Sequence, residues 1–207
     1  MARAKSAATR KTSRKTARRG RRSTTRSARP TRRSEPRNDA IALLQADHRK
    51  VEDLFAKFER ARGDDRKRAL AENICTSLRV HSQIEEEIFY PAFYEATGEE
   101  DLHHEAIIEH DGAKKLIAEI ESSGPGDDYF DARVTVLSEM IKHHVREEEQ
   151  RDGMFSKARE SGMDLAELGA RLGERKSQLE NEPGLLKGAK QLKDAGKGLM
   201  SRVLGEI

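Results

Sequence analysis

The sequence of 207 residues has one cysteine, no tryptophan and few aromatic residues of any kind. The single thiol, Cys75, cannot form an internal disulfide, and no pair of closely spaced cysteines is present to hold zinc. The apolar runs are only a few residues long, too short for a transmembrane helix, and we expect no signal peptide. No phosphate-binding glycine loop occurs, which disfavours a kinase. These absences argue against a disulfide-stapled secreted protein, and we expect a cytoplasmic one.

Charged residues are abundant, at 37% of the chain against 4% for aromatic residues. This balance is typical of helices with solvated outer faces around a modest core, and not of a β-sandwich. The length suffices for one medium-sized domain with tails. We therefore predict an all-α protein.

The charge is distributed unevenly along the chain. Residues 1–37 contain 15 Lys and Arg against a single acid, Glu35, whereas the remaining residues contain 25 basic and 36 acidic side chains. Residues 1–37 also contain no Val, Ile, Leu, Phe or Tyr, so they cannot offset their ordering entropy by burying apolar surface. We predict a disordered basic arm on an acidic body.

A basic arm of this kind can bind nucleic acid without sequence specificity, because its Lys and Arg side chains release counterions from the phosphates. Binding of that kind would associate the protein with the nucleoid. The alternative is a solubilising tail with no fixed partner. A transit peptide fits less well, since residues 1–37 offer no amphipathic face.

Residues 38–160 contain four segments whose apolar residues recur at helical spacing. The first segment should begin at Asn38 or Asp39, because either side chain can cap a helix. Pro91 should end or kink the second segment. The loop at residues 122–128 precedes the fourth segment and supplies an aspartate to cap it. The pattern predicts an up-down four-helix bundle.

Each of the four apolar stripes is interrupted by a histidine that should face the core. On the second and fourth stripes a glutamate follows four residues later, on the same face of the helix. A single histidine on a core face is more often structural than a ligand, but correlated placement on four helices favours a metal site. A buried carboxylate is also costly unless it is paired or binds a metal. The candidate ligands are His48, His81, Glu85, His110, His144 and Glu148.

An alternative register exists on the fourth segment, where His143 and Glu147 have the same spacing. We prefer His144 and Glu148 because their stripe carries no charge before the histidine. Other polar residues nearby, namely His103, His104, Glu86 and Glu87, are expected at the surface or outside the ligand set.

Imidazole and carboxylate ligands suit iron, zinc or manganese better than calcium or magnesium. Two carboxylates that can bridge suit a pair of metal ions, and helical bundles build such sites from side chains on facing helices. We prefer iron.

Over residues 38–160, the order His, His-x3-Glu, His, His-x3-Glu resembles the hemerythrin-like, or HHE cation-binding, family. The resemblance implies a pair of non-haem irons with the four histidines as terminal ligands and the two glutamates as bridges. It implies a protein that binds or senses dioxygen, peroxide or iron. Peroxide dismutation at the metals is the enzymatic alternative.

The sequence departs from the oxygen-carrying hemerythrins at one position. Those proteins use a fifth histidine, four residues from another on the third helix, where this chain has Ala106 before His110 and Lys114 after it. One iron would then lack an imidazole, unless water, His143 or another acid replaces it. This departure disfavours reversible oxygen carriage.

Two further segments follow the predicted bundle. Residues 161–182 fit a fifth helix that begins at Asp164 and packs on the bundle, and the segment resembles an extension found in many bacterial members of the family. Its leucines on one side are Leu165, Leu168, Leu172 and Leu179. Residues 183–207 are a weakly amphipathic basic tail, which we expect to become helical only on a partner or a lipid surface.

Overall fold

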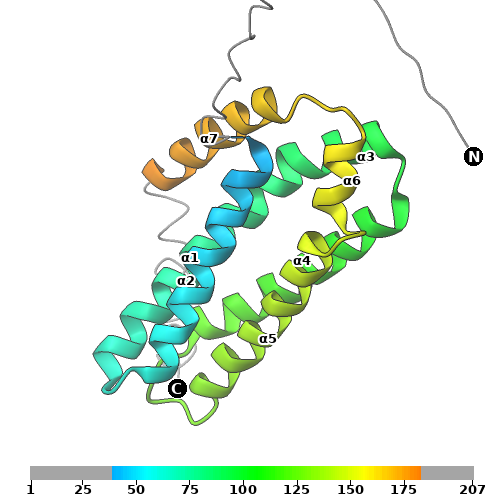
Figure 1. Ribbon diagram of the computed structural model, residues 1–207. Coiled ribbons are helices and arrows are strands. Elements are labelled where there is room, and N and C mark those ends of the chain that lie inside the picture. The colour runs from blue at the N-terminus through cyan, green and yellow to red at the C-terminus, as the bar shows by residue number, and fades with distance from the viewer. Residues whose placement is uncertain (1–38, 183–207) are drawn as a thin grey trace, which may run out of the picture. The chain divides into compact units, whose positions relative to one another are not determined.

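The computed structural model describes residues 39–182, and within that range the secondary structure is entirely helical (Figure 1). The all-α fold is therefore confirmed. The basic arm predicted at residues 1–37 and the tail predicted at residues 183–207 lie outside the described residues. The helices are α1 Ala40–Arg60, α2 Asp64–Ile84, the π-helix η1 Glu85–Phe89, α3 Tyr90–Thr97, α4 Glu100–Ser122, α5 Phe130–Glu149, α6 Met154–Glu160 and α7 Leu165–Asn181.

Four helical rods form the predicted up-down bundle: α1, the continuous rod α2–η1–α3, α4 and α5. Helix α1 packs against α2 and α5, and α4 packs against the same two helices from the other side. Consecutive rods are therefore neighbours, as short connections require.

The predicted start of the first helix is confirmed, but the predicted cap of the fourth is not. Asp39 caps α1, because its Oδ1 accepts a hydrogen bond of 2.8 Å from the Ala42 amide. The aspartate expected to cap α5 does not do so. Asp127 Oδ1 instead accepts hydrogen bonds from the Tyr129 amide and the Arg133 guanidinium, which closes the loop before the helix.

Of the two alternatives predicted for Pro91, an end of the second rod is wrong, because the helix continues beyond the proline. The chain forms one turn of π-helix before the proline, in which the Tyr90 amide donates to the Glu85 carbonyl five residues earlier. The rod then continues to Thr97 and ends at Gly98, whose φ is +68°. A π-turn widens the helix where Pro91 has no amide hydrogen to donate, and it turns Tyr90 toward the face that carries Glu85.

The apolar core consists of two clusters separated by a polar layer. One cluster lies at the end of the bundle that holds the start of α1 together with α3, α6 and α7. The other lies toward the opposite end, between the second half of α1, the first half of α2, the second half of α4, and α5. Along α1, for example, Leu44 belongs to the first cluster and Val51 to the second, and His48 lies between them.

Helices α6 and α7 close one end of the bundle. Helix α6, which the sequence pattern did not predict, buries Met154, Phe155 and Ala158 in the first cluster. Helix α7 begins where predicted, because Asp164 Oδ1 accepts hydrogen bonds from the amides of the first turn. It packs on α1 and α2 through a stripe of buried leucines (Figure 1): Leu168, Leu172 and Leu179.

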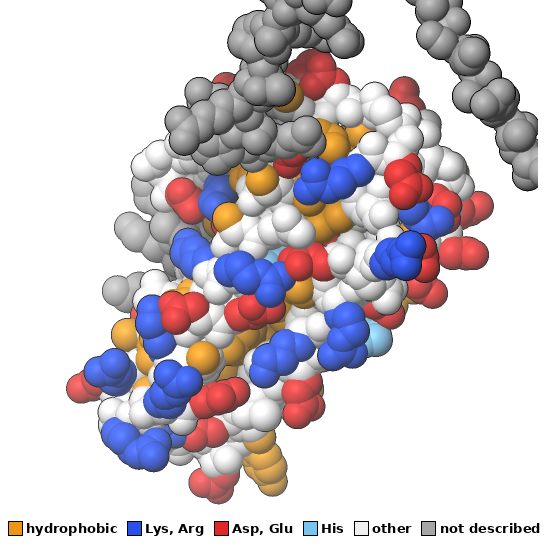
Figure 2. Space-filling view, viewed as in Figure 1, with side chains coloured by type: hydrophobic (Ala, Val, Ile, Leu, Met, Phe, Trp, Pro, Cys, Tyr) orange, Lys and Arg blue, Asp and Glu red, His pale blue; other side chains and the backbone are white. Residues whose placement is uncertain are grey.

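The face of the bundle seen in Figure 2 carries Lys and Arg interspersed with Asp and Glu. None of the helices in this range combines the length and the apolar content that crossing a membrane would need.

Candidate metal centre

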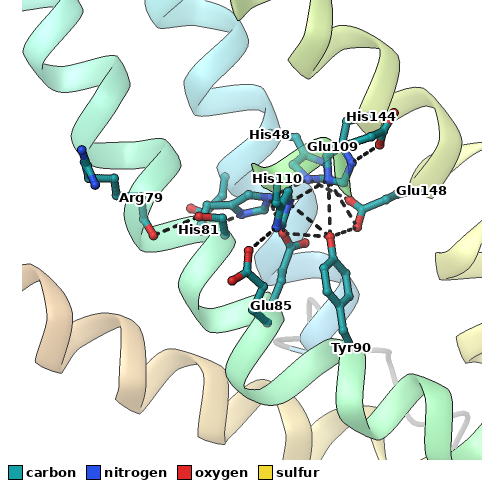
Figure 3. Close-up of polar contacts among 12 residues, drawn as sticks. His48, Arg79, His81, Glu85, Tyr90, Glu109, His110, His144 and Glu148 are labelled. Carbon is teal, nitrogen blue, oxygen red and sulfur yellow. Dashed lines mark hydrogen bonds and ion pairs between the residues drawn. The ribbon is translucent and has the colours of Figure 1, made fainter. Parts of the chain in front are cut away.

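The polar layer brings all of the predicted ligand side chains together in the middle of the bundle (Figure 3). Their donor atoms form two groups that share Glu85, and within each group one atom per residue lies within 4.8 Å of the others. The first group consists of His48, His81, Glu85 and Glu148, and the second of Glu85, His110 and His144. Every member is buried.

The four imidazoles form two pairs whose Nε2 atoms point inward. His48 Nε2 lies 3.0 Å from His81 Nε2, and His110 Nε2 lies 3.2 Å from His144 Nε2. The members of each pair come from different helices: α1 and α2 supply one pair, and α4 and α5 supply the other.

The two glutamates connect these imidazole pairs. Glu85 Oε2 lies 3.1 Å from His81 Nε2 and 3.5 Å from His110 Nε2. Glu148 makes the equivalent connection between the other two histidines, at 3.3 and 3.7 Å. Each carboxylate therefore reaches one imidazole of each pair.

On the outside of the layer, every imidazole presents its Nδ1 atom to a second carboxylate. Three of these contacts are hydrogen bonds of 2.7 to 2.8 Å, and the fourth, from His81 to Asp47, is longer at 3.8 Å. Metal-binding histidines typically hydrogen-bond a carboxylate through the nitrogen that does not face the metal, which fixes the tautomer and the ring orientation. The pairs are His48 with Glu149, His81 with Asp47, His110 with Glu86 and His144 with Glu109.

Three of the four outer carboxylates are in turn held by a cation from another part of the bundle. Arg49 pairs with Glu149, Lys114 with Glu86, and Lys176 of α7 with Asp47. The predicted extension thus supports the polar layer as well as covering the apolar end.

Burial and neighbouring charges strongly shift the pKa values within the layer. Burial lowers the pKa of His81 to about 4. Burial alone would also lower the pKa of His48, but hydrogen bonds to Glu148 and Glu149 raise it to about 9. Burial alone would raise the pKa of Glu148, but the neighbouring histidines outweigh this effect and lower the pKa to about 2. The pKa of Glu85 is raised well above its ordinary value by burial and by the charge of Glu148.

The layer also contains polar atoms without hydrogen-bond partners. Glu85 Oε1 is fully buried and accepts no hydrogen bond from the described residues, and the buried Glu148 Oε2 faces His48 Nε2 at 3.3 Å. Unpartnered buried carboxylate oxygens are costly and rare in folded proteins. Together with the inward Nε2 atoms, they form a donor set that fits transition-metal ions.

Sequence reasoning missed Tyr90, which lies at the centre of this arrangement. Its hydroxyl donates to Glu148 Oε1 at 3.0 Å and lies 3.3 Å from His110 Nε2 and 3.4 Å from His144 Nε2. It lies 3.5 Å from Glu85 Oε2 as well. Burial and the neighbouring carboxylates raise the pKa of Tyr90 well above its ordinary value. Tyr90 immediately precedes Pro91, and this proline was the one signal nearby in the sequence, although it does not indicate a π-turn.

The alternative pair on the fourth segment lies outside the buried groups. The His143 side chain is 57% exposed, and Glu147 is partly exposed beside it. His104 is exposed as predicted, whereas His103 is half-buried against the rings of Tyr90 and Tyr94. Glu86 contacts His110 through its Nδ1 atom, and Glu87 pairs with Arg175 at the surface.

Comparison with known proteins agrees with this geometry. A solved structure of a hemerythrin HHE cation-binding domain-containing protein from Mycobacterium kansasii has a similar fold, with a TM-score of 0.59 and 24% identity over 68% of this chain and 86% of that one. A curated relative, named DNA nickase, from Nostoc sp. (strain PCC 7120) is 30% identical over 107 residues, which are 52% of this chain and 30% of that protein. The chain thus spans less than a third of the length of that relative. The family model of the hemerythrin HHE cation-binding domain matches residues 39–155, more than half of the chain, and the chain therefore belongs to this family of metal-binding domains.

Proposed function

We propose that the polar layer holds a pair of non-haem iron ions and that the protein binds or senses dioxygen, peroxide or iron. The observation that carries the proposal is the position of the two glutamates. Each of them contacts one histidine of the His48–His81 pair and one histidine of the His110–His144 pair. That arrangement suits two metal ions better than one. Zinc or manganese are the alternative occupants. The proposed ligands are His48, His81, Glu85, His110, His144 and Glu148.

When bound, an iron pair would supply the redox chemistry toward dioxygen or peroxide. The protein would hold the metal ions in place and determine which molecules reach them. The four imidazoles line a cavity of about 20 Å³ whose other walls are largely apolar, including Val51, Leu78 and Ile117. A space of this size admits a molecule of about the size of water. Dioxygen and peroxide therefore fit the proposal better than a larger organic substrate.

Tyr90 is our candidate for the ligand that the sequence lacks. The positions of the fifth hemerythrin histidine hold Ala106 and Lys114, while the Tyr90 hydroxyl lies among Glu148, His110 and His144. In Tyr90→Phe the ring still fills its place but the oxygen is absent. We expect iron-loaded protein to show a visible phenolate-to-iron absorption band that this variant lacks. An unchanged visible spectrum in Tyr90→Phe would leave the phenol only as a hydrogen-bond donor.

The test of the metal centre is reconstitution with ferrous iron, followed by gel filtration, metal analysis and the near-ultraviolet absorption of a diferric site. We expect close to two irons per chain, and a loss of most of that iron in His81→Ala. The matched control is His104→Ala, which removes an exposed histidine from α4. No retained transition metal in the wild type, or equal retention in both variants, would refute the proposal.

The enzymatic form of the proposal is peroxide dismutation, which is measured as oxygen evolution from peroxide by the iron-loaded protein. Activity that is lost in His81→Ala and kept in His104→Ala would support it. Iron-loaded protein that evolves no oxygen would leave binding or sensing as the function.

The second candidate function is nucleic-acid binding through residues 1–37. Two observations favour it: the 15 basic residues of that segment against one acid, and the name of the Nostoc relative. Deletion of residues 1–37 should abolish retention on DNA while the helical signal of the bundle remains, and retention by the full chain should weaken steeply with salt. DNA retention that survives the deletion would count against this function.

A further inference from the structure

The outer carboxylate behind His144 differs from the other three. Asp47, Glu86 and Glu149 each have a Lys or Arg partner, but among the ion pairs of residues 39–182 Glu109 has none. Its neighbours on the outer side are a histidine and another glutamate. Three of the four outer carboxylates are therefore neutralised by a Lys or Arg side chain, and Glu109 is not.

The residues around Glu109 have the composition and spacing of a metal site. His143 and Glu147 are four residues apart on α5, with His143 Nε2 at 3.1 Å from Glu147 Oε1. Glu109 extends from α4 to the same point, with its Oε1 at 3.5 Å from His143 Nε2. One donor atom from each residue lies within 4.8 Å of the other two.

This cluster is connected directly to the buried layer. Glu109 Oε1 faces His143, while Glu109 Oε2 accepts the hydrogen bond of 2.7 Å from His144 Nδ1. Glu109 and His144 are both labelled in Figure 3, and they meet through Nδ1, the ring nitrogen of His144 that does not contact His110. A carboxylate shared in this way joins the surface cluster to a proposed ligand of the iron pair.

A small hollow leads inward beside the shared carboxylate. Glu105, Glu109 and Glu147 line it together with His144 and Glu148. Glu148 is only 2% exposed, whereas Glu105 is exposed to solvent. The lining of the hollow thus runs from exposed and partly exposed acids to a buried carboxylate of the proposed metal centre.

We propose that Glu109, His143 and Glu147 form a surface site for a divalent transition-metal ion, and that the buried centre is loaded through it. One imidazole and two carboxylates suit ferrous iron, manganese or zinc, with water completing the coordination. The exposure of His143 allows rapid exchange with solvent, which a loading site needs. The clustered negative charge raises the local concentration of cations at the mouth of the hollow. The loading role rests on the proposed function of the buried centre, whereas the surface site does not.

The equilibrium test uses Co²⁺ as the probe, with the metal-free full chain and the double variant His143→Ala/Glu147→Gln. We expect the wild type to bind one more Co²⁺ than the variant, measured by titration of the visible cobalt absorption and by calorimetry. The control is His104→Ala/Glu139→Gln, which makes the same chemical changes at exposed positions on α4 and α5. Equal stoichiometry in all three proteins would overturn the surface site and leave the cluster as an ion-pair network.

The kinetic test follows the entry of Co²⁺ into the buried centre by stopped-flow absorption at low ionic strength. In His143→Ala/Glu147→Gln we expect loading to slow by about tenfold, the lower end of what charge focusing supplies, with the same final spectrum of the buried centre. Loading as fast as in the control double variant would overturn the loading role.

A further variant, His81→Ala, separates this proposal from the proposed function. In His81→Ala the buried centre is impaired, while Glu109, His143 and Glu147 are unchanged. If this variant binds the exchangeable surface ion, the surface site is supported whatever the buried centre does. If wild-type protein binds only an ion that His143→Ala/Glu147→Gln removes, the surface site stands and the buried iron pair is refuted.

Discussion

At Glu85, metal binding and folding make opposite demands on one side chain. The residue is 0% exposed, its Oε1 atom has no hydrogen-bond partner, and Glu148 is close enough to help raise its pKa. A buried acid in this setting costs free energy in the metal-free protein, either as a charge or through its forced protonation. Natural proteins keep such residues where function requires them.

We therefore expect Glu85→Gln to stabilise the metal-free protein by about 1 to 2 kcal/mol, because an amide of the same shape carries no charge. The same variant should lose most of its iron, since it lacks the carboxylate that connects His81 to His110. Urea unfolding and metal analysis measure the two effects. Glu72→Gln, at an exposed position on α2, should change neither. A destabilised metal-free Glu85→Gln protein would contradict this account of the polar layer.

Cys75 is a second buried residue whose chemistry is set by its surroundings. It is 1% exposed, and burial together with the charge of Glu121 raises the pKa of its thiol to about 12. The reactive species is the thiolate, so the native protein should react with a disulfide reagent only through unfolding, whereas guanidinium-unfolded protein should react at once. Because the folded pKa lies above the unfolded one, this group's contribution to stability is full below about pH 9 and is lost as the pH rises toward 12. Rapid labelling of the native thiol at neutral pH would contradict the packing at this position.

The end of α5 depends on a glycine. A Cβ atom at Gly153 would lie 2.2 Å from the Glu147 carbonyl oxygen and 2.8 Å from that of Glu148, and both atoms belong to the backbone. Since neither can move without unwinding the last turn of α5, Gly153→Ala should destabilise the protein by about 1 to 3 kcal/mol and weaken iron retention through Glu148. Gly126→Ala is the control, because a Cβ there meets nothing within 4 Å. Equal melting temperatures for the two variants would show that the turn is adaptable.

The helices that could be predicted were those with a clear apolar period and a capping side chain. Asp39 and Asp164 show this, because each side chain accepts the amide hydrogen bonds expected of it. Helix α6, with only seven residues, is too short for a period to be recognised, and tertiary contacts of Met154 and Phe155 hold it in place. The π-turn could not be predicted either. Pro91 indicates that the helix is disturbed but does not indicate that the disturbance is a π-turn.

The same reasoning applies to the polar layer. Histidines and glutamates on the inward stripes could be predicted, because spacing alone determines which face they occupy. Tyr90 could not, since its position depends on the extra residue in the π-turn. The outer carboxylates could not either: Glu109 and Glu149 lie on helices whose relative rotation is fixed only by packing in the folded bundle.

On the scale of the whole bundle, the polar layer separates two apolar clusters that would otherwise form one core. Folding of residues 39–182 must therefore bury charged and unpartnered groups at mid-height, where all four rods meet. A bound metal pair would join α1, α2, α4 and α5 at this level, because each of them contributes at least one proposed ligand. Metal binding and bundle stability are therefore linked.

This linkage leads to a prediction about metal removal. An ion present at a thousand times its dissociation constant stabilises the state that binds it by about 4 kcal/mol. For a domain of this size that corresponds to a fall in melting temperature of about 10 °C when the iron is stripped by a chelator. Hydrogen exchange should show the largest loss of protection around His48, His81, His110 and His144, because the ligands would lose their common partner there. His81→Ala should melt at the same temperature with and without chelator, which separates metal loss from any direct effect of the reagent. A wild-type protein whose melting temperature and exchange do not respond to chelation would mean that the layer is held together by its carboxylate–histidine contacts alone.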